Sequence, residues 1–565
     1  MRTGGTGLPR SKERISVANA IEREPRLPLI FYGVEFNLAD LFESVVDVVA
    51  DREAMVCEDD RLTYAGLEER ANRLGHHLQE QGIGTGDHVG VQLYNSVEYL
   101  TTAVACLKIR AVPVNVNYRY VEDELAYLYD DADLVGLVVH RELAARTAAV
   151  RPPKLGHVLL VDDDSGADLG GLDAVAFEEA LAKASPQRDF PPRSPDDLYI
   201  IYTGGTTGMP KGVMWRQEDI FFSGMGGGDP AGQPAERPEQ IAERAAGREP
   251  SATFPMAPLM HGAAQLASFI SFHWGGKVVL QHKFDPKAAL RLIERERVNT
   301  VSLVGDAMAR PLADALGEPD ADYDLSSLIV VSSAGAVFSD TVREQLRTHL
   351  PNIFLVDAYG ASETGHQGSA TAESSPEKGL RFAMNERTAV LDDDLRRVEP
   401  GSGVVGRVAL KGHVPLGYYK DPKKTADTFR EIDGERWVLP GDMAMVEEDG
   451  TVLVLGRGSV CINSGGEKIY PEEVEAALKS HPDVFDAVVV GVPDEKWGER
   501  VTALVQARAG TAPAPDDIVA HCRTKVAGYK VPRAVHLLDE LHRSPSGKPD
   551  YPWARARARA LTGGD

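Results

Sequence analysis

The amino-acid sequence predicts an α/β fold, with a large N-terminal domain of layered, mostly parallel sheets and helices, followed by a small α+β C-terminal domain. Three observations support this prediction. The chain has 565 residues, more than one hydrophobic core can organise. Strand-like and helix-like segments alternate from residue 38 onward. A composition shift at Leu455–Ser459 separates a large domain (37–456) from a small domain (457–565), and the polar N-terminus is expected to form an arm (1–36) before them.

Composition and charge limit the class of protein. The hydrophobic fraction of 43% and the charged fraction of 26% are typical of a globular protein. A formal net charge of -24 repels nucleic acid and anionic membranes, so any anionic ligand must be held by local donors. No apolar run reaches the roughly 18 residues of a membrane span. We therefore expect no nucleic-acid partner and no membrane span.

The cysteines and the N-terminus bear on the compartment. The four cysteines contain no C-x-x-C pair, so neither a disulfide framework nor a zinc site is indicated. Residues Met1–Arg14 lack the apolar core of a signal peptide. We expect a cytoplasmic protein. The sequence is compatible with a homodimer but does not specify the oligomeric state.

The first elements follow from apolar spacing and from capping residues. Leu38–Val49 has a helical spacing of apolar residues, with Asn37 as N-cap. A strand is expected at Ala54–Cys57. A second helix begins after Thr63 and ends at Gly82, before a strand at His88–Leu93. This alternation predicts parallel sheet.

Three β-branched runs later in the chain each lead into a loop of small or polar residues. Ligands of open α/β sheets bind at the carboxyl ends of the strands, so these loops are candidate pocket walls. The runs are Val298–Val304, Leu328–Ser332 and Ile353–Val356, and the loops are Gly305–Met308, Ser333–Val337 and Asp357–Gly365.

Two other regions complete the outline. A surface loop with a short helix at Glu239–Ala246 is expected within Ser223–Pro250. After the composition shift, a compact βα module is expected. Its segments are Tyr470–Leu478, Ala487–Val492, Val501–Ala507 and Pro515–Val526, with a basic helical end from Ala554.

A glycine- and threonine-rich loop follows the strand expected at Leu198–Tyr202 and extends to Gly212. Glycines allow backbone N–H groups to approach phosphate oxygens closely, and threonine hydroxyls and a lysine add donors and positive charge. The loop therefore predicts a phosphate-binding site. Its candidate ligands are Thr203, Gly204, Gly205, Thr206, Thr207, Gly208 and Lys211.

This loop is neither of two common nucleotide motifs. A Walker A loop has its lysine directly after glycine and before a hydroxyl residue, whereas Pro210 and Gly212 flank Lys211. The G-x-G-x-x-G pattern is absent as well. A generic phosphate cradle would suit kinases and ligases alike, and Pro210 and Gly212 argue against the first.

The whole loop resembles the signature of the adenylate-forming superfamily, which contains acyl-CoA synthetases, peptide-synthetase adenylation domains and firefly-type luciferases. The resemblance covers about Asn37 to Trp553 and includes further motifs in the same order. It implies a small, mobile C-terminal domain that swings after the first half-reaction. It also implies ATP and Mg²⁺, and coenzyme A as co-substrate.

The segment Asp357-Ala358-Tyr359-Gly360-Ala-Ser362-Glu363 is similar to the family's Tyr-Gly-x-Thr-Glu motif. By this resemblance the tyrosine stacks on adenine, the hydroxyl binds phosphate and Glu363 binds magnesium, a hard cation that prefers carboxylate oxygen. Gly335 and Ala336 are further expected nucleotide neighbours. A nucleophile elbow is excluded because the second glycine of G-x-S-x-G is missing.

Asp442 and Arg457 resemble the family's ribose-binding pair. Pro440 stands where the family has threonine, which removes a hydroxyl and a backbone donor but leaves the carboxylate. Near the C-terminus, Lys548 follows Ser-Gly as in the family's adenylation loop, and this resemblance implies that it stabilises charge at the α-phosphate.

The segment Gly458–Glu475 resembles the hinge and the glycine-rich segment that reaches the pantetheine channel. Gly465, Gly466, Glu467 and Lys468 are its candidate binding residues, and Ser459 departs from the usual hinge residue. Hinges need torsional freedom more than a particular side chain, so rotation is still expected. His261 resembles the family's channel residue between acyl pocket and nucleotide and is a third catalytic candidate, beside Lys548 and Glu363.

The resemblance implies an ATP-dependent acyl-CoA synthetase. Within that class, three segments resemble those of bacterial synthetases that act on steroid side-chain acids, namely Lys211–Arg216, Gly305–Arg310 and Gly456–Asn463. Trp215, Met308 and the small Gly335 and Ala336 would suit a broad apolar pocket, although a tryptophan and a methionine more often simply fill a core. A bulky apolar acid, steroidal or diterpenoid, is the expected small-molecule partner. Medium- or long-chain fatty acids, or transfer of the acyl group to a carrier protein, are the alternatives.

Overall fold

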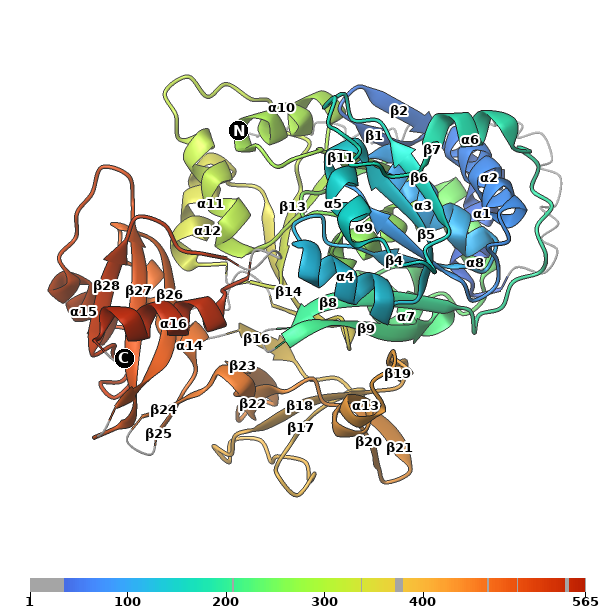
Figure 1. The fold of residues 1–565 in the computed structure, drawn as a ribbon. Coiled ribbons are helices and arrows are strands. Elements are labelled where there is room, and N and C mark those ends of the chain that lie inside the picture. Colours follow the sequence, from blue (N-terminus) through green and yellow to red (C-terminus); the bar gives the residue numbers. More distant parts are fainter. Residues whose placement is uncertain are drawn as a thin grey trace, which may run out of the picture. The chain divides into compact units, whose positions relative to one another are not determined.

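The computed structural model describes residues 35–205, 208–336, 338–370, 380–464, 467–494, 496–543 and 548–563. These residues form two mostly parallel sheets, one antiparallel sheet and a smaller mixed sheet, with helices against the two parallel sheets (Figure 1). The expected arm at 1–36 lies outside the described residues up to Val34. The predicted α/β class is confirmed.

The first large sheet consists of six parallel strands bordered by one antiparallel strand at each edge. In spatial order its strands are β15 (Gly365–Ala370), β14 (Phe354–Ala361), β13 (Val330–Ala334), β12 (Thr300–Leu303), β10 (Ala252–Pro255), β11 (Lys277–Leu280), β1 (Glu53–Cys57) and β2 (Asp60–Thr63). The carboxyl ends of β12, β13 and β14 lie at one edge, as expected for a ligand site.

The second large sheet also has a parallel centre, with an antiparallel pair at one edge. Its strands are β19 (Gly417–Tyr418), β9 (Gly208–Arg216), β8 (Leu198–Gly205), β4 (Val112–Asn115), β3 (His88–Gln92), β5 (Leu134–His140), β6 (His157–Val161) and β7 (Val175–Ala176). Strands β8 and β9 form a hairpin that carries the predicted phosphate loop.

An antiparallel sheet that the sequence did not reveal follows the two large sheets. Its strands are β16 (Leu380–Ala383), β23 (Thr451–Arg457), β22 (Asp442–Val446), β18 (Gly406–Lys411), β21 (Glu435–Val438) and β20 (Phe429–Ile432), with β17 (Thr388–Leu391) on β18. The C-terminal sheet contains β25 (Glu467–Ile469), β24 (Ile462–Ser464), β27 (Gly498–Ala507) and β26 (Val484–Asp494), with β28 (Ala534–Leu538) parallel to β27.

The helices begin largely where capping residues predict them. Asn37 accepts the backbone N–H groups of Ala39 and Asp40, and Thr63 accepts that of Gly66, so both predicted N-caps are confirmed. The helices of the N-terminal part are α1 (Leu38–Val49), α2 (Tyr64–Glu80), α3 (Val97–Lys108), α4 (Glu122–Asp131), α5 (Ala144–Val150), α6 (Phe177–Lys183), α7 (Gln217–Gly224), α8 (Glu239–Gly247), α9 (Gly262–His273), α10 (Pro286–Glu296), α11 (Gly305–Leu316) and α12 (Asp340–His349). Those that follow are α13 (Pro422–Thr428), α14 (Pro471–Lys479), α15 (Pro515–Arg523) and α16 (Tyr551–Leu561).

Two of the expected loops are regular structure. Gly305–Met308 is the first turn of α11, and Asp357–Gly365 is mostly a β-hairpin between β14 and β15. Both were predicted as loops because glycine, alanine and serine give no strong helix or strand pattern. The hairpin tolerates little change, since a Cβ on Gly360 would collide with the Gly365 carbonyl.

The hydrophobic core of the C-terminal part is separate from those of the large sheets. Ile462, Val474, Leu478, Val489 and Val501 are among its fully buried members. A part with its own buried core is able to move as a unit. No described helix is long and apolar enough to cross a membrane.

Candidate active site

Three predicted residues from different strands converge beside β14. The Tyr359 hydroxyl donates to Asp442 Oδ2 at 2.9 Å, and Arg457 Nε lies 3.2 Å from Asp442 Oδ1. The antiparallel register of β22 and β23 places Asp442 directly opposite Arg457. One face of the Tyr359 ring is covered by Phe382, with ring centroids 5.0 Å apart. A residue of the first sheet is thereby joined to two residues of the antiparallel sheet.

The electrostatics of this group favour a charged Arg457. Burial lowers the pKa of Arg457, but the neighbouring carboxylates of Asp442 and Glu363 more than offset this and raise it. Burial and the adjacent Asp442 raise the pKa of Tyr359 well above its ordinary value. Tyr359 therefore stays a hydrogen-bond donor to a carboxylate, and the carboxylate has lone pairs left for a second donor.

Lys548 lies near the group of Tyr359, Asp442 and Arg457, although it belongs to the C-terminal part of the chain. Its Cε is 3.7 Å from where a Cβ on Gly335 would lie. Burial lowers the pKa of Lys548, and Arg457 lowers it further, whereas Glu363 and Asp442 oppose the shift. Lys548 thus shares one electrostatic environment with Arg457, Asp442 and Glu363, although it is more than ninety residues away from them in sequence.

The turn between β14 and β15 that contains Glu363 is fixed by two hydrogen bonds from other strands. The indole Nε1 of Trp215 donates to the Ser362 carbonyl at 3.0 Å, and the hydroxyl of Tyr418 donates to Glu363 Oε1 at 2.8 Å. Trp215 is fully buried and supports this turn, which agrees with the core-filling alternative. Gly365, at φ 64°, approaches the Ser223 carbonyl so closely that a Cβ would lie 2.8 Å from it.

The phosphate loop is the tip of the β8–β9 hairpin. Thr203 pairs with Lys211 across the ladder, and Gly205 pairs with Gly208. The ammonium of Lys211 forms an ion pair with Asp421. Gly204 lies in β8, and Thr206 and Thr207 lie outside the described residues. The loop is therefore shorter than the sequence predicted, because both strands extend into it.

His261 caps the start of α9 and is partly buried. Burial, together with the nearby cations of Lys548 and Arg119, lowers the pKa of His261 to about 3. The imidazole is therefore neutral near neutral pH and can offer one donor and one acceptor. A neutral imidazole does not begin a reaction as a cationic acid.

The remaining candidates are less closely associated with this group. Asp357 is ion-paired with Arg343, so its carboxylate is already engaged, while Ala358 and Gly360 continue β14. Ala336 follows Gly335 after β13. Glu467 and Lys468 are exposed on β25, and the contacts described for that strand do not join them to Asp442 or Arg457. Gly465 and Gly466 lie outside the described residues.

Sequence reasoning missed Tyr418 and Asp421. The segment from Gly417 to Pro422 has the pattern of a turn followed by a helix start, and Asp421 is indeed the N-cap of α13. Nothing local indicates that both side chains reach residues of the site. No signal within the segment distinguishes these two residues from those of an ordinary turn before a helix.

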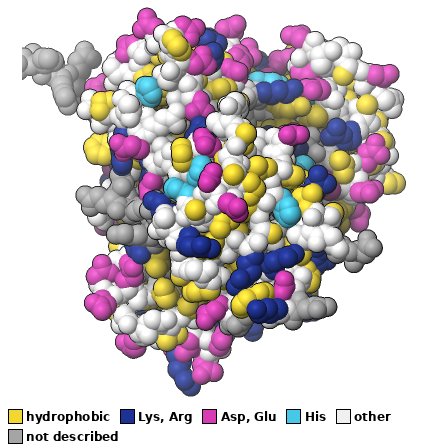
Figure 2. All heavy atoms as spheres, turned by 90° about the vertical axis from the view of Figure 1, so that its left-hand side faces the viewer, with side chains coloured by type: hydrophobic (Ala, Val, Ile, Leu, Met, Phe, Trp, Pro, Cys, Tyr) yellow, Lys and Arg dark blue, Asp and Glu magenta, His cyan; other side chains and the backbone are white. Residues whose placement is uncertain are grey.

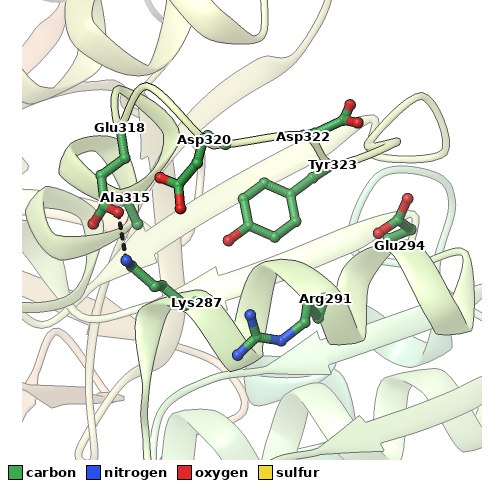
Figure 3. Close-up of a pocket in the computed structure, with 9 residues that line it drawn as sticks. Lys287, Arg291, Glu294, Ala315, Glu318, Asp320, Asp322 and Tyr323 are labelled. Atoms are coloured by element: carbon green, nitrogen blue, oxygen red, sulfur yellow. Dashed lines mark hydrogen bonds and ion pairs between the residues drawn. The ribbon is translucent and has the colours of Figure 1, made fainter.

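The described residues also contain a surface pocket of about 400 Å³ between α10 and the segment after α11. Lys287 is paired with Glu318 there, and Arg291 lines the pocket from the same helix as Lys287 (Figure 3). None of its lining residues is a predicted site residue.

Elsewhere, acidic side chains are spread over the face in Figure 2, so positive charge for an anionic ligand is a local feature.

A buried carboxyl group, that of Glu472, lies next to Arg457. Glu472 in α14 accepts the Arg457 backbone N–H at 3.4 Å, while its Oε2 is buried without a hydrogen-bond partner among the described residues. A Cβ on Gly456 would collide with that oxygen. Burial, and then the charge of Glu475, raise the pKa of Glu472 to about 8.

We expect Glu472→Gln to raise the melting temperature increasingly as pH rises from about 5 to about 8. Unfolded glutamate ionises near its usual pKa, whereas the folded one stays protonated up to about 8. The wild type therefore loses stability as pH rises through this window, and the amide does not. Thermal denaturation at both pH values measures the difference.

Glu473→Gln is the matched control, since Glu473 is the next residue and is ion-paired with Lys530. Glu473→Gln removes the ion pair with Lys530 but leaves the buried Oε2 of Glu472, which has no described hydrogen-bond partner, in place. A Glu472→Gln difference that is the same at both pH values would contradict the linkage.

Comparisons with known proteins show the family of this chain. Residues 42–419 match the family "AMP-binding enzyme", and residues 473–548 match "AMP-binding enzyme C-terminal domain". A medium/long-chain-fatty-acid–CoA/3-oxocholest-4-en-26-oate–CoA ligase of Mycobacterium marinum is 50% identical over 94% of this chain and 98% of its own length. A 3-oxocholest-4-en-26-oate–CoA ligase of Rhodococcus rhodochrous is 49% identical, over 92% and 95%.

Solved structures share the fold. The anthranilate CoA ligase AuaEII, in complex with anthranoyl-AMP, superimposes with a TM-score of 0.80 at 24% identity, covering 94% of this chain and 98% of that one. ATP-bound MatB of Rhodopseudomonas palustris gives 0.77 at 24% identity, covering 93% and 99%.

Proposed function

Because this chain belongs to the AMP-binding enzyme family, we propose that it activates a bulky apolar carboxylic acid through an acyl-adenylate and transfers the acyl group to coenzyme A. It is an AMP-forming acyl-CoA synthetase. The observation that carries the proposal is the convergence of Lys548 with Glu363, Asp442 and Arg457. A lysine beside a nucleotide-binding carboxylate pair suits charge stabilisation at a phosphate.

The chain's own residues divide the work of the first step. Asp442 accepts the Tyr359 hydroxyl, forms an ion pair with Arg457 and has capacity left for ribose hydroxyls. Tyr359 provides the aromatic surface for adenine, and the β8–β9 hairpin with Lys211 holds the outer phosphates. Lys548 stabilises the charge that develops as the substrate carboxylate attacks the α-phosphate and pyrophosphate leaves.

Magnesium fits the carboxylate that the chain offers. Glu363 is 9% exposed, and the described residues contain no cluster of three or more potential metal ligands. Mg²⁺ characteristically takes one or two carboxylates together with substrate phosphates and water. The ion, when bound with ATP, neutralises phosphate charge, and Glu363 would hold it.

The second step needs no strong base, because a thiol with a pKa near 8.5 attacks an already activated anhydride. Neutral His261 is assigned to the passage between acyl group and nucleotide. The large domain is proposed to end at residue 456, and the separate core of the C-terminal part supports this boundary. Gly465, Gly466, Glu467 and Lys468 are assigned to the pantetheine channel.

The substrate class proposed first is a steroid side-chain acid. Relatives at 49–50% identity over more than nine-tenths of the chain are named for 3-oxocholest-4-en-26-oate. Medium- and long-chain fatty acids are the second candidate, because one of these names includes them. Free cysteines are compatible with the proposed cytoplasmic location.

Pyrophosphate release with a panel of acids tests the function. We expect the highest kcat/KM with a 3-oxosteroid C26 acid, a lower value with long-chain fatty acids, and a CoA thioester as product by mass spectrometry. A diterpenoid acid completes the panel, and a carrier protein offered in place of coenzyme A tests the other acceptor. If no acid supports release, the proposal is wrong. Light scattering on the same preparation tests whether the protein is a homodimer.

A further inference from the structure

The segment Gly417–Asp421 is fixed to the phosphate hairpin by its backbone. Tyr418 lies opposite Val213 in the β19–β9 pair, and the Tyr419 N–H donates to the Gly212 carbonyl at 2.8 Å. At the end of the segment, Asp421 Oδ1 accepts the Lys424 N–H at 2.8 Å and so starts α13. The side chains of this segment are therefore presented from a rigid support on both sides.

Tyr418 acts on Glu363. Its hydroxyl donates to Glu363 Oε1 at 2.8 Å, and both side chains are buried. Burial and the carboxylate beside it raise the pKa of Tyr418, so the phenol remains a donor. A hydrogen bond between a phenol and a buried carboxylate is charge-assisted and directional. It fixes Oε1 and thereby gives Oε2 a defined direction.

Asp421 acts on Lys211. Its Oδ2 forms an ion pair with the Lys211 ammonium, which also lies 6.0 Å from the centroid of the Tyr418 ring. Both side chains of the ion pair are partly exposed, and such pairs add little to stability. Lysine is a point charge on a flexible stem, so what the pair contributes is the location of that charge.

We propose that Tyr418 and Asp421 are positioning residues that hold Glu363 and Lys211 in the orientation in which they bind Mg²⁺-ATP. The inference rests on the proposed function, which assigns Glu363 to the metal and Lys211 to the outer phosphates. One short segment sets the direction of both charged groups.

A double-mutant cycle tests the first pair, with ATP affinity measured by calorimetry. Tyr418→Phe removes only the hydroxyl and is expected to weaken Mg²⁺-ATP binding about fivefold. In a Glu363→Gln background the same change should alter affinity less than about twofold. With EDTA in place of Mg²⁺, Tyr418→Phe should leave ATP affinity unchanged. The same loss in both backgrounds would overturn the assignment.

A second cycle tests Asp421 with Lys211. Asp421→Asn keeps a good N-cap but removes the charge, and it is expected to weaken ATP binding about threefold to tenfold. In a Lys211→Gln background it should have no effect. Asp421→Ala, which also removes the cap, reports the structural contribution through its melting temperature. Tighter ATP binding by Asp421→Asn would show competition with phosphate and would overturn a positioning role.

Tyr419→Phe is the matched control, because the Tyr419 hydroxyl donates to Asp133 at 2.8 Å and is not directed at Glu363 or Lys211. It should leave ATP affinity and kcat unchanged. The two proposals fail in different ways. If wild-type protein does not exchange pyrophosphate into ATP with any acid, the proposed function is wrong. If it does exchange but both cycles are additive, only the positioning roles are wrong.

Discussion

Lys548→Ala is expected to lower acyl-adenylate formation by about 10²- to 10³-fold, the usual effect of removing one donor from developing charge. The side chain lies beside Gly335 and shares the electrostatic environment of Glu363, Asp442 and Arg457. The reaction of preformed acyl-adenylate with coenzyme A should fall less than about tenfold, since no phosphate charge develops there. Exchange of labelled pyrophosphate into ATP and thioester formation from synthetic adenylate measure the two halves separately.

Lys530→Ala is the control for Lys548→Ala. Lys530 belongs to the same C-terminal part and is ion-paired with Glu473, away from the site. It should leave both half-reactions unchanged. Equal loss of both halves in Lys548→Ala would contradict a role confined to the first step and with it the proposed domain swing.

Asp442→Ala is expected to weaken ATP binding about 100-fold, because the buried carboxylate that accepts Tyr359 and pairs with Arg457 is lost together with the proposed ribose contact. Asp442 is buried, and Tyr359 and Arg457 both depend on it. Asp442→Asn keeps one acceptor oxygen and should fall between Asp442→Ala and wild type. Calorimetric titration with ATP measures the affinity, and thermal denaturation separates it from loss of fold.

Tyr359→Phe separates the ribose contact from support of the carboxylate. It removes one donor to Asp442 but keeps the ring, so ATP affinity should fall less than about tenfold. If Asp442→Ala binds ATP as wild type does, Asp442 is not a nucleotide ligand, and the assignment of Arg457 as its partner loses its basis.

The sequence predicted best what depends on neighbouring residues. Helices α1 and α2 begin at Asn37 and Thr63 because a capping side chain and a helical apolar stripe occur together. Parallel strands were predicted where β-branched runs alternate with helices. The antiparallel sheet was missed because its short strands, such as β22 and β23, pair through long-range register, which local patterns do not encode.

In the site, too, local motifs were predicted and long-range contacts were missed. Asp442, Arg457, Glu363 and Lys548 were predicted from motifs, and the structure brings them together. For Trp215 the sequence left open a pocket wall and a core position, and the structure shows its indole donating to the Ser362 carbonyl, a contact between segments far apart in sequence that no local pattern encodes. Tyr418 and Asp421 were missed because a turn before a helix explains them locally.

The two glycines of the β14–β15 hairpin have a consequence for protein engineering. At Gly360 and Gly365 any side chain meets backbone atoms, of Gly365 and Ser223 respectively, and backbone cannot be repacked by changing a neighbour's side chain. Libraries designed to alter acid preference should therefore vary the surrounding side chains and keep these two positions constant. Acid preference can then change while the backbone of this hairpin, which carries Glu363, keeps its conformation.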